Sequence, residues 1–335
     1  MKKFLLIILL AVFVFSCKRD SVEETPFSTT PYNFETAAHF PPPNLSSANP
    51  MTSEGVELGR KLYYDPLLSN NGLSCSSCHL QSKGFTGVSP FTMPVLPHVN
   101  LAWSNNFLWD GREHGPMEHM MLFEVRDFFQ TDLSKINNNQ TYKDLFKEAF
   151  NINYIGHQDI ANALAQFINT LHSGNSKFDK FLRKELNLDL SETRGFIIFN
   201  TEKGDCFHCH TIPLMTDNFF HNIGLDTDLT GVNAGHFNSS GNPTDRGKFK
   251  TPTLRNVALR TEFMHDGRFK SLEEVIEHYD SGVNMTSENL DPIMTKPGKE
   301  FGLELTPLDK QDLINFLKSL TDTSFITNPA FSKPN

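Results

Sequence analysis

Two short stretches decide what kind of protein this chain is: Cys75-Ser76-Ser77-Cys78-His79 and Cys206-Phe207-His208-Cys209-His210. Each has two cysteines separated by two residues and followed at once by a histidine. This spacing is the attachment pattern of a c-type haem, in which two thiols add to the vinyl groups and the histidine binds the iron. One helical turn brings both sulfurs and the imidazole to the same porphyrin. The pattern therefore predicts two covalently bound haems.

Other uses of these cysteines fit the pattern less well. A zinc site needs four ligands around one metal, and the two pairs lie much further apart than in a zinc ribbon. A thioredoxin-type dithiol would not need a histidine after each pair. A disulfide across three residues would constrain almost nothing. The fifth cysteine, Cys17, belongs to the N-terminal segment, so none is left for a structural disulfide.

The N-terminus is typical of an export signal. Lys2 and Lys3 precede an apolar run from Phe4 to Phe15. This run is too short to cross a bilayer as a helix, which needs about 20 apolar residues. Val14-Phe15-Ser16-Cys17 resembles a bacterial lipobox, whose cysteine is lipidated. We predict a signal peptide at residues 1–17, a periplasmic protein, and a lipid anchor at Cys17 as its membrane contact; the alternative is an ordinary signal peptide with an incidental cysteine.

Length and charge set further bounds on the mature protein. The 335 residues are enough for two ordinary domains. The net charge of −9 argues against a nucleic-acid partner, which would require a basic surface. Residues 18–50 are polar and rich in Pro, Ser, Thr and Asn, and we predict a tether followed by an extended arm.

The remaining sequence favours helices. One amphipathic helix is predicted over about 157–172 from apolar residues at helical spacing: Ile160, Leu164, Phe167, Ile168 and Leu171. The stretches 271–274 and 306–309 have the pattern of capping boxes that begin helices. Strand alternation is scarce, and the loops at 80–107 and 211–250 are long. The expected fold class is therefore mainly α.

The chain also contains an internal repeat. Asn100 precedes Leu108-Trp109-Asp110-Gly111-Arg112, and Asn256 precedes Met264-His265-Asp266-Gly267-Arg268 at the same offset. Each block lies downstream of one haem motif. We therefore predict two cytochrome c-like haem domains in tandem, an N-terminal one at residues 51–180 and a C-terminal one at residues 181–325.

With these motifs the sequence resembles the bacterial di-haem cytochrome c peroxidases, and in particular their MauG-like branch. The resemblance extends from about Pro41 to Leu320, and its most specific segments are 57–69, 108–112, 251–258 and 265–268. It implies that the haem on His79 is the peroxidatic one and that the haem on His210 receives electrons from a donor. It also implies that Trp109 lies between the haems and transfers electrons; an ordinary core tryptophan is the alternative.

The sequence departs from the peroxidases near the first haem. No histidine lies between Lys83 and Val95, where those enzymes often have a displaceable distal ligand. The MauG-like enzymes lack it too, so the resemblance implies an iron on His79 that is open on its other face. Met93 is the rival ligand, and His98 stands next to a turn, which is a poor position for one.

The sequence offers three candidates for the distal acid and base. The family places a Gln and a Glu after the Asp-Gly-Arg sequence. His119 stands at the Gln position, and Glu124 and Asp127 are the nearest acids. Cleavage of peroxide needs a group that moves a proton from one oxygen to the other. These three residues are the candidates, and a solvated helix residue is the alternative for each.

At the second haem, Tyr279 stands at the family's ligand offset from His265, where peroxidases have Met and MauG-like proteins have Tyr. We predict that Tyr279 ligates or directly neighbours the iron on His210; Met285 or Met294 is the alternative ligand. The family also binds a calcium ion between its domains. The corresponding positions in this chain are Pro94, Arg260 and Glu262, so the resemblance leaves this ion open.

The expected function is that of a periplasmic di-haem peroxidase. It would reduce hydrogen peroxide with electrons from a small donor protein, a cytochrome c or a cupredoxin. The alternatives are a MauG-like oxidase that modifies a partner protein and a di-haem electron carrier without peroxide turnover. Trp103 and Trp109 are the only tryptophans, so a long hopping chain to a partner would need tyrosines as well.

Overall fold

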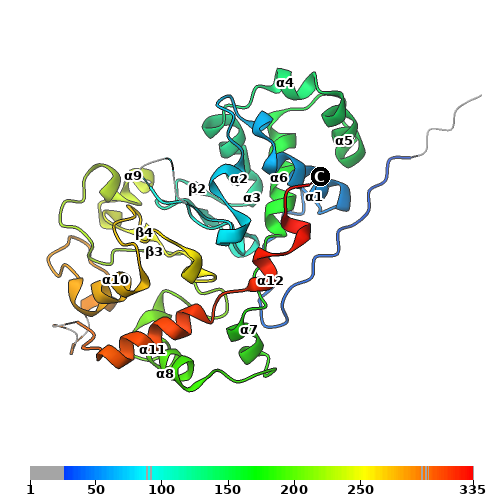
Figure 1. Cartoon of the computed structure of the whole chain (residues 1–335). Coiled ribbons are helices and arrows are strands. Elements are labelled where there is room, and N and C mark those ends of the chain that lie inside the picture. The colour runs from blue at the N-terminus through cyan, green and yellow to red at the C-terminus, as the bar shows by residue number, and fades with distance from the viewer. Residues whose placement is uncertain are drawn as a thin grey trace, which may run out of the picture.

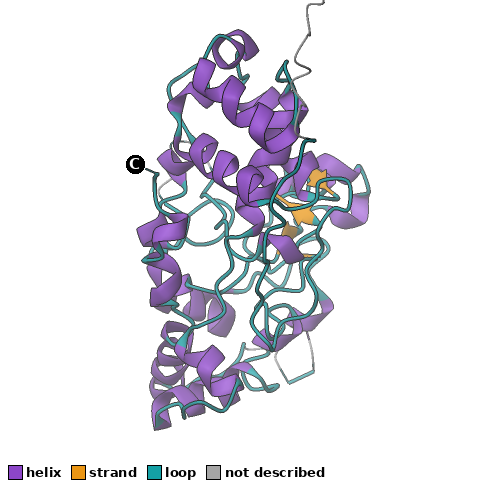
Figure 2. Cartoon of the chain, turned by 90° about the vertical axis from the view of Figure 1, so that its right-hand side faces the viewer, coloured by secondary structure: helices purple, strands orange, loops and turns teal. Residues whose placement is uncertain are grey.

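The computed structural model describes residues 26–87, 90, 93–295, 297, 298, 300 and 302–334. The predicted signal peptide at 1–17 and the start of the tether lie outside the described residues. Short helices and long loops make up most of the chain, as Figure 2 shows, and the mainly α prediction is confirmed. Within the described part, no helix is long and apolar enough to cross a membrane.

The elements fall along the chain into two series, one around each haem motif (Figure 1). The first series comprises α1 (Ser53–Tyr64), α2 (Cys75–Cys78), β1 (Asn106–Phe107), β2 (Glu113–His114), α3 (Met117–Phe123), α4 (Leu133–Asn137), α5 (Gln140–Phe150) and α6 (His157–Asn169). The second comprises α7 (Lys177–Leu182), α8 (Leu190–Phe199), β3 (Phe220–His221), α9 (Phe237–Ser240), β4 (Phe249–Lys250), α10 (Leu272–Glu277), α11 (Pro307–Lys318) and α12 (Thr323–Ile326). The strands pair antiparallel, β1 with β2 and β3 with β4.

The predicted helix starts agree with the structure. Helix α6 covers nearly all of the amphipathic stretch. Thr306 caps α11 through a reciprocal bond with Asp309, and Pro307 is its first residue. Ser271 accepts a hydrogen bond from the Glu274 backbone at the start of α10. These local signals work because the first backbone N–H groups of a helix have no partner inside the helix.

Each half of the molecule has its own hydrophobic core, built around one close helix pair. In the first core α1 crosses α6, and a Cβ on Gly59 would lie 1.9 Å from the Ala163 carbonyl oxygen. In the second core α8 crosses α11, and a Cβ on Gly195 would lie 2.0 Å from the Asp312 carbonyl oxygen. A glycine at each crossing lets the two backbones touch, so the two halves repeat the same packing.

The internal repeat extends to the backbone conformation. Asn100 and Asn256 both adopt the left-handed region, with φ of 58° and 59°, and each begins a short 3-10 turn. Leu108 and Met264 also have positive φ, at 62° and 67°. Non-glycine residues rarely adopt this conformation. The internal repeat in the sequence is therefore matched by the same backbone conformation at these two pairs of positions.

The two repeats meet at a buried polar junction. Asn100 exchanges two hydrogen bonds with the Ser173 backbone, and the Asn256 amide donates to the Ser173 hydroxyl. Asp322 accepts from that hydroxyl and from the backbone N–H groups of Gly174 and Asn175. Nearly every polar group at this junction is hydrogen-bonded. The segment around Ser173 that links the two halves is therefore held in one conformation.

The N-terminal arm and the C-terminal segment both contact the junction between the two halves or cross it. Residues 26–52, the described part of the arm preceding α1, contain no helix. This segment packs at the junction: His39 bonds the buried Asp179 at 2.7 Å, and the Trp103 indole donates to the Pro41 carbonyl oxygen. At the other end, α12 and the following turn return to the first core, where Phe325 and Phe331 are buried (Figure 1, red).

Candidate functional site

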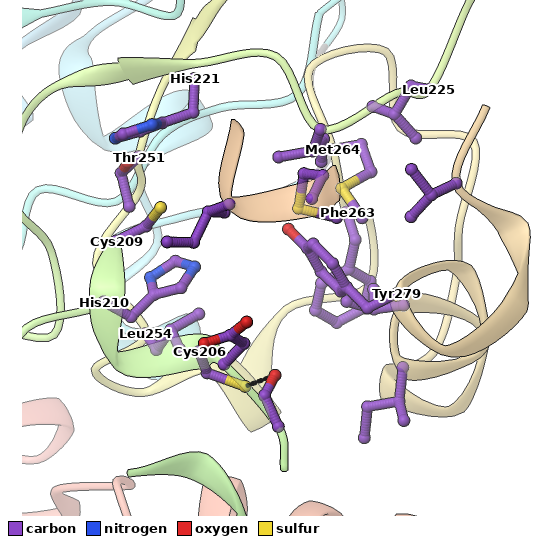
Figure 3. A pocket seen from close by; sticks show the side chains of 18 of the residues that line it. Cys206, Cys209, His210, His221, Leu225, Thr251, Leu254, Phe263, Met264 and Tyr279 are labelled. Atoms are coloured by element: carbon purple, nitrogen blue, oxygen red, sulfur yellow. Dashed lines mark hydrogen bonds between the residues drawn. The ribbon is translucent and has the colours of Figure 1, made fainter. Parts of the chain in front are cut away.

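The second haem motif lies on one wall of a cavity of about 300 Å³. Figure 3 shows His210 and Tyr279 entering this pocket from opposite sides, with Cys206 and Cys209 beside the histidine. The rest of the lining is mostly apolar and includes Leu254, Phe263, Leu272, Ile276, Leu313 and Leu317. An apolar cavity with two thiols and an imidazole on one wall has the donor set that a c-type haem requires.

Both motif histidines are oriented by a backbone carbonyl group. His79 Nδ1 lies 3.0 Å from the Phe85 oxygen, and His210 Nδ1 lies 3.2 Å from the Met215 oxygen. A donated Nδ1–H leaves Nε2 free to bind a metal. Burial lowers the pKa of each histidine to about 4, so both imidazoles are in the neutral form that binds iron.

Two buried cations also fit a haem in this pocket. Burial lowers the pKa of Lys250 to about 8, and its ammonium contacts the Thr251 carbonyl oxygen at 3.4 Å. Burial lowers the pKa of Arg260 to about 10, and its Nε has no hydrogen-bond partner among the described residues. Buried charges need a partner, and the propionate carboxylates of a haem would supply it.

His221 is a third charged group that lines the pocket. His221 bonds Asp217 through Nε2 at 2.8 Å and Asp291 through Nδ1 at 2.6 Å. Burial opposes protonation of this histidine, but the two carboxylates, followed by the Cys209 sulfur, outweigh it and raise its pKa to about 12. The imidazolium therefore links β3 to the loop that carries Met294.

Tyr279 lies in a single π turn, His278–Gly282, directly after α10. It lines the pocket together with Leu272, Val275 and Ile276, as the sequence pattern predicted. Its buried phenol has a raised pKa, because burial disfavours the anion. The rival ligands Met285 and Met294 line the same pocket, so the choice between them stays a prediction.

We expect Tyr279→Phe to change the low-spin spectrum of the second haem and to raise its reduction potential. A phenolate is an anionic donor that stabilises ferric iron, and phenylalanine removes only the oxygen. Met285→Ala and Met294→Ala are the controls and should leave both properties unchanged. Optical and electron paramagnetic resonance spectra measure the outcome. If the low-spin spectrum persists in Tyr279→Phe but is lost in Met285→Ala or Met294→Ala, the ligand is that methionine and not Tyr279.

The first haem motif forms α2, with Cys75 buried in the first core. Glu124 is half-buried and begins a π turn, Glu124–Phe128, after α3. Its charge raises the pKa of both Cys75 and Cys78, which indicates that the carboxylate lies near these thiols. Burial, and then the charge of Glu113, raise the pKa of Glu124 to about 7. A carboxyl group that titrates near neutral pH suits proton transfer.

The three candidates for the distal acid and base differ in exposure and in charge pairing. His119 is exposed on α3. Asp127 is also exposed and bonds Arg126 at 2.7 Å; this pairing lowers its pKa. Glu113, which the sequence did not single out, is half-buried, and burial raises its pKa. Glu124 is therefore the candidate whose surroundings match the role.

His98 lies on the same side as His79. The two imidazole rings stack with centroids 3.5 Å apart and planes 15° apart. Two axial ligands of one iron would have their nitrogens about 4 Å apart across the metal, since each metal–nitrogen bond is roughly 2 Å, and their ring centres further still. In this stacked arrangement His98 cannot be the opposite ligand of the iron on His79. Met93 is partly buried.

Trp109 lies where the two repeats touch. The indole lines the second pocket, and its Nε1 donates to the Pro94 carbonyl oxygen in the loop after the first haem motif, at 2.9 Å. Its own carbonyl oxygen accepts from the Lys250 backbone N–H in β4. The neighbouring Gly111 packs so closely on Phe220 of β3 that a Cβ there would lie 2.2 Å from the ring.

The three positions expected for calcium come together in a small second pocket. Pro94 has no side-chain oxygen, Arg260 is a cation, and the Glu262 carboxylate bonds Lys270 at 3.0 Å. Calcium takes six to eight oxygen ligands. These residues therefore make a poor calcium site.

Several residues of the site could not be recognised in the sequence. Lys250, Arg260 and His221 are ordinary polar residues until the fold brings them to the pocket. Phe85 and Met215 act through backbone oxygens, so their side chains carry no signal. Phe85 and Met215 each lie a few residues after their haem motif and have positive φ, a conformation that only the structure reveals.

Comparisons with known proteins agree with this architecture. A family model described as di-haem cytochrome c peroxidase matches residues 53–187. The methylamine utilization protein MauG of Methylorubrum extorquens is 34% identical over 300 residues, which cover 84% of this chain and 82% of that protein. The cytochrome c551 peroxidase of Nitrosomonas europaea is 31% identical over 264 residues, covering 72% of this chain and 77% of the peroxidase.

Solved structures extend the likeness to three dimensions. The crystal structure of a MauG-like protein associated with microbial copper homeostasis superposes with a TM-score of 0.83 at 31% sequence identity. The match covers 90% of this chain and 99% of that one. Together with the two haem motifs and the pocket around His210, these likenesses show that the chain belongs to the family of di-haem cytochrome c peroxidases and MauG proteins, which implies two c-type haems.

Proposed function

We propose that this protein is an exported di-haem peroxidase that reduces hydrogen peroxide at the haem site of His79. Glu124 is the observation that supports this most directly. It is a half-buried carboxyl group near the first pair of haem-binding thiols, and its pKa of about 7 lets it accept and return a proton at neutral pH. A pure electron carrier has no need of such a group.

The other site residues have distinct roles in this proposal. When bound, the two haems supply the redox chemistry. His79 and His210 hold the irons, each oriented by its carbonyl partner. Trp109 lies in the contact between the repeats and carries electrons from the second site to the first. The donor is a small protein, a cytochrome c or a cupredoxin, and the compartment is the periplasm, with a lipid anchor at Cys17.

Ligand binding to the ferric protein tests the proposal. No histidine lies between Lys83 and Val95 in the sequence, and His98 stacks on the ring of His79 itself. We therefore expect a high-spin signal from the first haem and binding of cyanide and peroxide without prior reduction. The second haem should remain low-spin and unchanged. Stopped-flow absorbance and electron paramagnetic resonance measure both. If cyanide binds only after one-electron reduction, a sixth ligand blocks the first iron in the resting protein and the open-site proposal is wrong.

Oxidation of a partner protein is the second candidate function. It is favoured by Tyr279, which occupies the place where peroxidases have a methionine, and by the likeness to MauG. Steady-state turnover distinguishes the two. A peroxidase oxidises a reduced cytochrome or cupredoxin rapidly, whereas a MauG-like oxidase turns such donors over slowly and keeps its oxidising equivalents after peroxide is added.

A further inference from the structure

The loop that follows the second haem motif is held in place by the segment 253–255. Three successive carbonyl oxygens of the loop accept hydrogen bonds from three successive residues of this segment. The Pro213 oxygen accepts from the Arg255 guanidinium at 2.5 and 3.0 Å, the Leu214 oxygen from the Thr253 hydroxyl at 2.7 Å, and the Met215 oxygen from the Leu254 backbone N–H at 3.2 Å. The Met215 oxygen is also the partner of His210 Nδ1. The segment therefore fixes the acceptor that orients the haem-binding histidine.

Arg255 is itself anchored by a fully buried ion pair. Its guanidinium donates to both carboxylate oxygens of Asp179 in α7, at 2.8 and 2.9 Å, and neither side chain is exposed. The Phe40 ring lies against the face of the guanidinium, with its centroid 4.7 Å away. Burial opposes ionisation of Asp179, but the hydrogen bonds and charge of Arg255 outweigh it and lower its pKa to about 2. A planar group bonded on two edges and covered on one face has a single orientation.

The first repeat has the same backbone bond to its acceptor carbonyl group. His79 Nδ1 lies 3.0 Å from the Phe85 oxygen, and this oxygen also accepts the backbone N–H of His98 at 3.1 Å. His98 and Leu254 are equivalent, because each stands two residues before the repeated asparagine. One backbone bond to the acceptor is therefore common to both haem sites.

The repeats differ in the side chains on either side of that residue. Where the second repeat has Thr253 and Arg255, the first has Pro97 and Val99. Proline and valine have no side-chain donor, and Val99 is buried in the first core. The repeated fold can therefore form without the hydroxyl and the guanidinium. A buried ion pair is expensive to desolvate and adds little net stability, so the position that it gives to the loop explains it better.

We propose that Thr253 and Arg255 are positioning residues that keep the reduction potential of the second haem low. They hold the Met215 carbonyl group in place as the acceptor for the Nδ1–H of His210. A histidine that donates to a fixed acceptor is a more basic ligand through Nε2, and a more basic ligand favours ferric iron. The use of this low potential rests on the proposed function, in which electrons pass from the second haem to the first.

A paired substitution tests Arg255 without leaving an unpaired charge in the core. Arg255→Val with Asp179→Asn removes both charges and gives position 255 the residue of the first repeat. We expect the midpoint potential of the second haem to rise by roughly 59 mV, which is a tenfold shift towards the ferrous form. The potential of the first haem should not change. Spectroelectrochemical titration of the di-haem protein measures both potentials.

Arg194 and Asp312 form a matched control pair in the same repeat. They join α8 to α11 at 2.5 Å, and the Asp312 side chain is buried, but they do not contact the haem loop. Arg194→Val with Asp312→Asn should lower the melting temperature and leave both potentials unchanged. Equal shifts in the two double variants would indicate a general loss of packing and overturn the proposal. An unchanged second potential in Arg255→Val with Asp179→Asn would also overturn it.

Thr253→Val is an independent variant that keeps the ion pair. Valine has the shape of threonine but cannot donate to the Leu214 oxygen, so the second potential should rise by a smaller amount. Exchange of the His210 Nδ1 proton with water, followed in the hyperfine-shifted proton resonance spectrum, should become faster in Thr253→Val and in the Arg255 double variant.

Thr253→Val decides the matter if the double variant does not bind haem. An unchanged potential together with an unchanged exchange rate of the His210 proton would then show that the segment does not position the histidine. None of these measurements uses peroxide. A protein that lacks peroxide turnover would therefore contradict the proposed function and leave the positioning role of Thr253 and Arg255 intact.

Discussion

Glu124→Gln is expected to lower the rate of peroxide reduction by roughly 10²–10⁴-fold, the range that a positioned general acid or base contributes. The amide keeps the size of the carboxyl group and its place in the π turn but cannot accept a proton. Haem content and the ferric spectrum should not change, because Glu124 is not a haem ligand. Steady-state oxidation of a reduced donor cytochrome by peroxide measures the effect.

The pH dependence of this rate has a defined sign. Peroxide binds as a neutral acid, so the carboxylate form of Glu124 is the one that can take its proton. With a pKa of about 7, that form is scarce below pH 7 and dominant above it. The rate should therefore rise as pH increases through about 7 and level off above it. Glu124→Gln should abolish this inflection.

Two neighbouring acids provide controls for Glu124. Asp127→Asn should have little effect, since Asp127 is exposed and paired with Arg126. Glu113→Gln should shift the inflection to lower pH, because the negative charge of Glu113 raises the pKa of Glu124. If Asp127→Asn abolishes turnover while Glu124→Gln leaves it intact, the assignment of the distal base is wrong.

Trp109→Phe is expected to slow donor-dependent turnover by about tenfold or more, equivalent to a barrier raised by about 1.4 kcal/mol. The indole lines the second pocket and bonds the loop that follows the first haem motif, so it lies on the contact between the repeats. Phenylalanine is smaller, harder to oxidise and unable to donate to the Pro94 carbonyl oxygen. Peroxide should still oxidise the first haem at the normal rate, and rapid mixing distinguishes the two steps.

The other tryptophan is a matched control. Trp103 is equally buried but donates to Pro41 in the arm and packs against Phe40 and His172. Trp103→Phe should therefore leave electron transfer between the haems unchanged, at a cost in stability of about 1 kcal/mol for the lost hydrogen bond. Equal turnover in Trp109→Phe and the unaltered protein would remove Trp109 from the electron path.

Much of the fold could be predicted from local sequence. Helix α11 begins at a Thr-Pro-Leu-Asp stretch because its cap groups are neighbours in the chain. The repeat of Asn100 and Asn256 indicated two similar halves, and both residues adopt the same rare backbone conformation. The return of Phe325 and Phe331 to the first core was not predicted. Nothing local distinguishes an apolar residue that packs on its own half from one that packs on the other.

The sequence by itself determined the family and predicted where the haems attach, because Cys-x-x-Cys-His chemistry depends on residues within one helical turn. It could also nominate Tyr279, whose offset from His265 lies within one loop and one helix. Only the tertiary structure distinguishes His119, Glu124 and Asp127 and favours Glu124, since their burial and the charges around them come from distant segments. It likewise stacked His98 on the ring of His79. Burial, stacking and pKa are properties of three-dimensional neighbours, and no spacing along the chain encodes them.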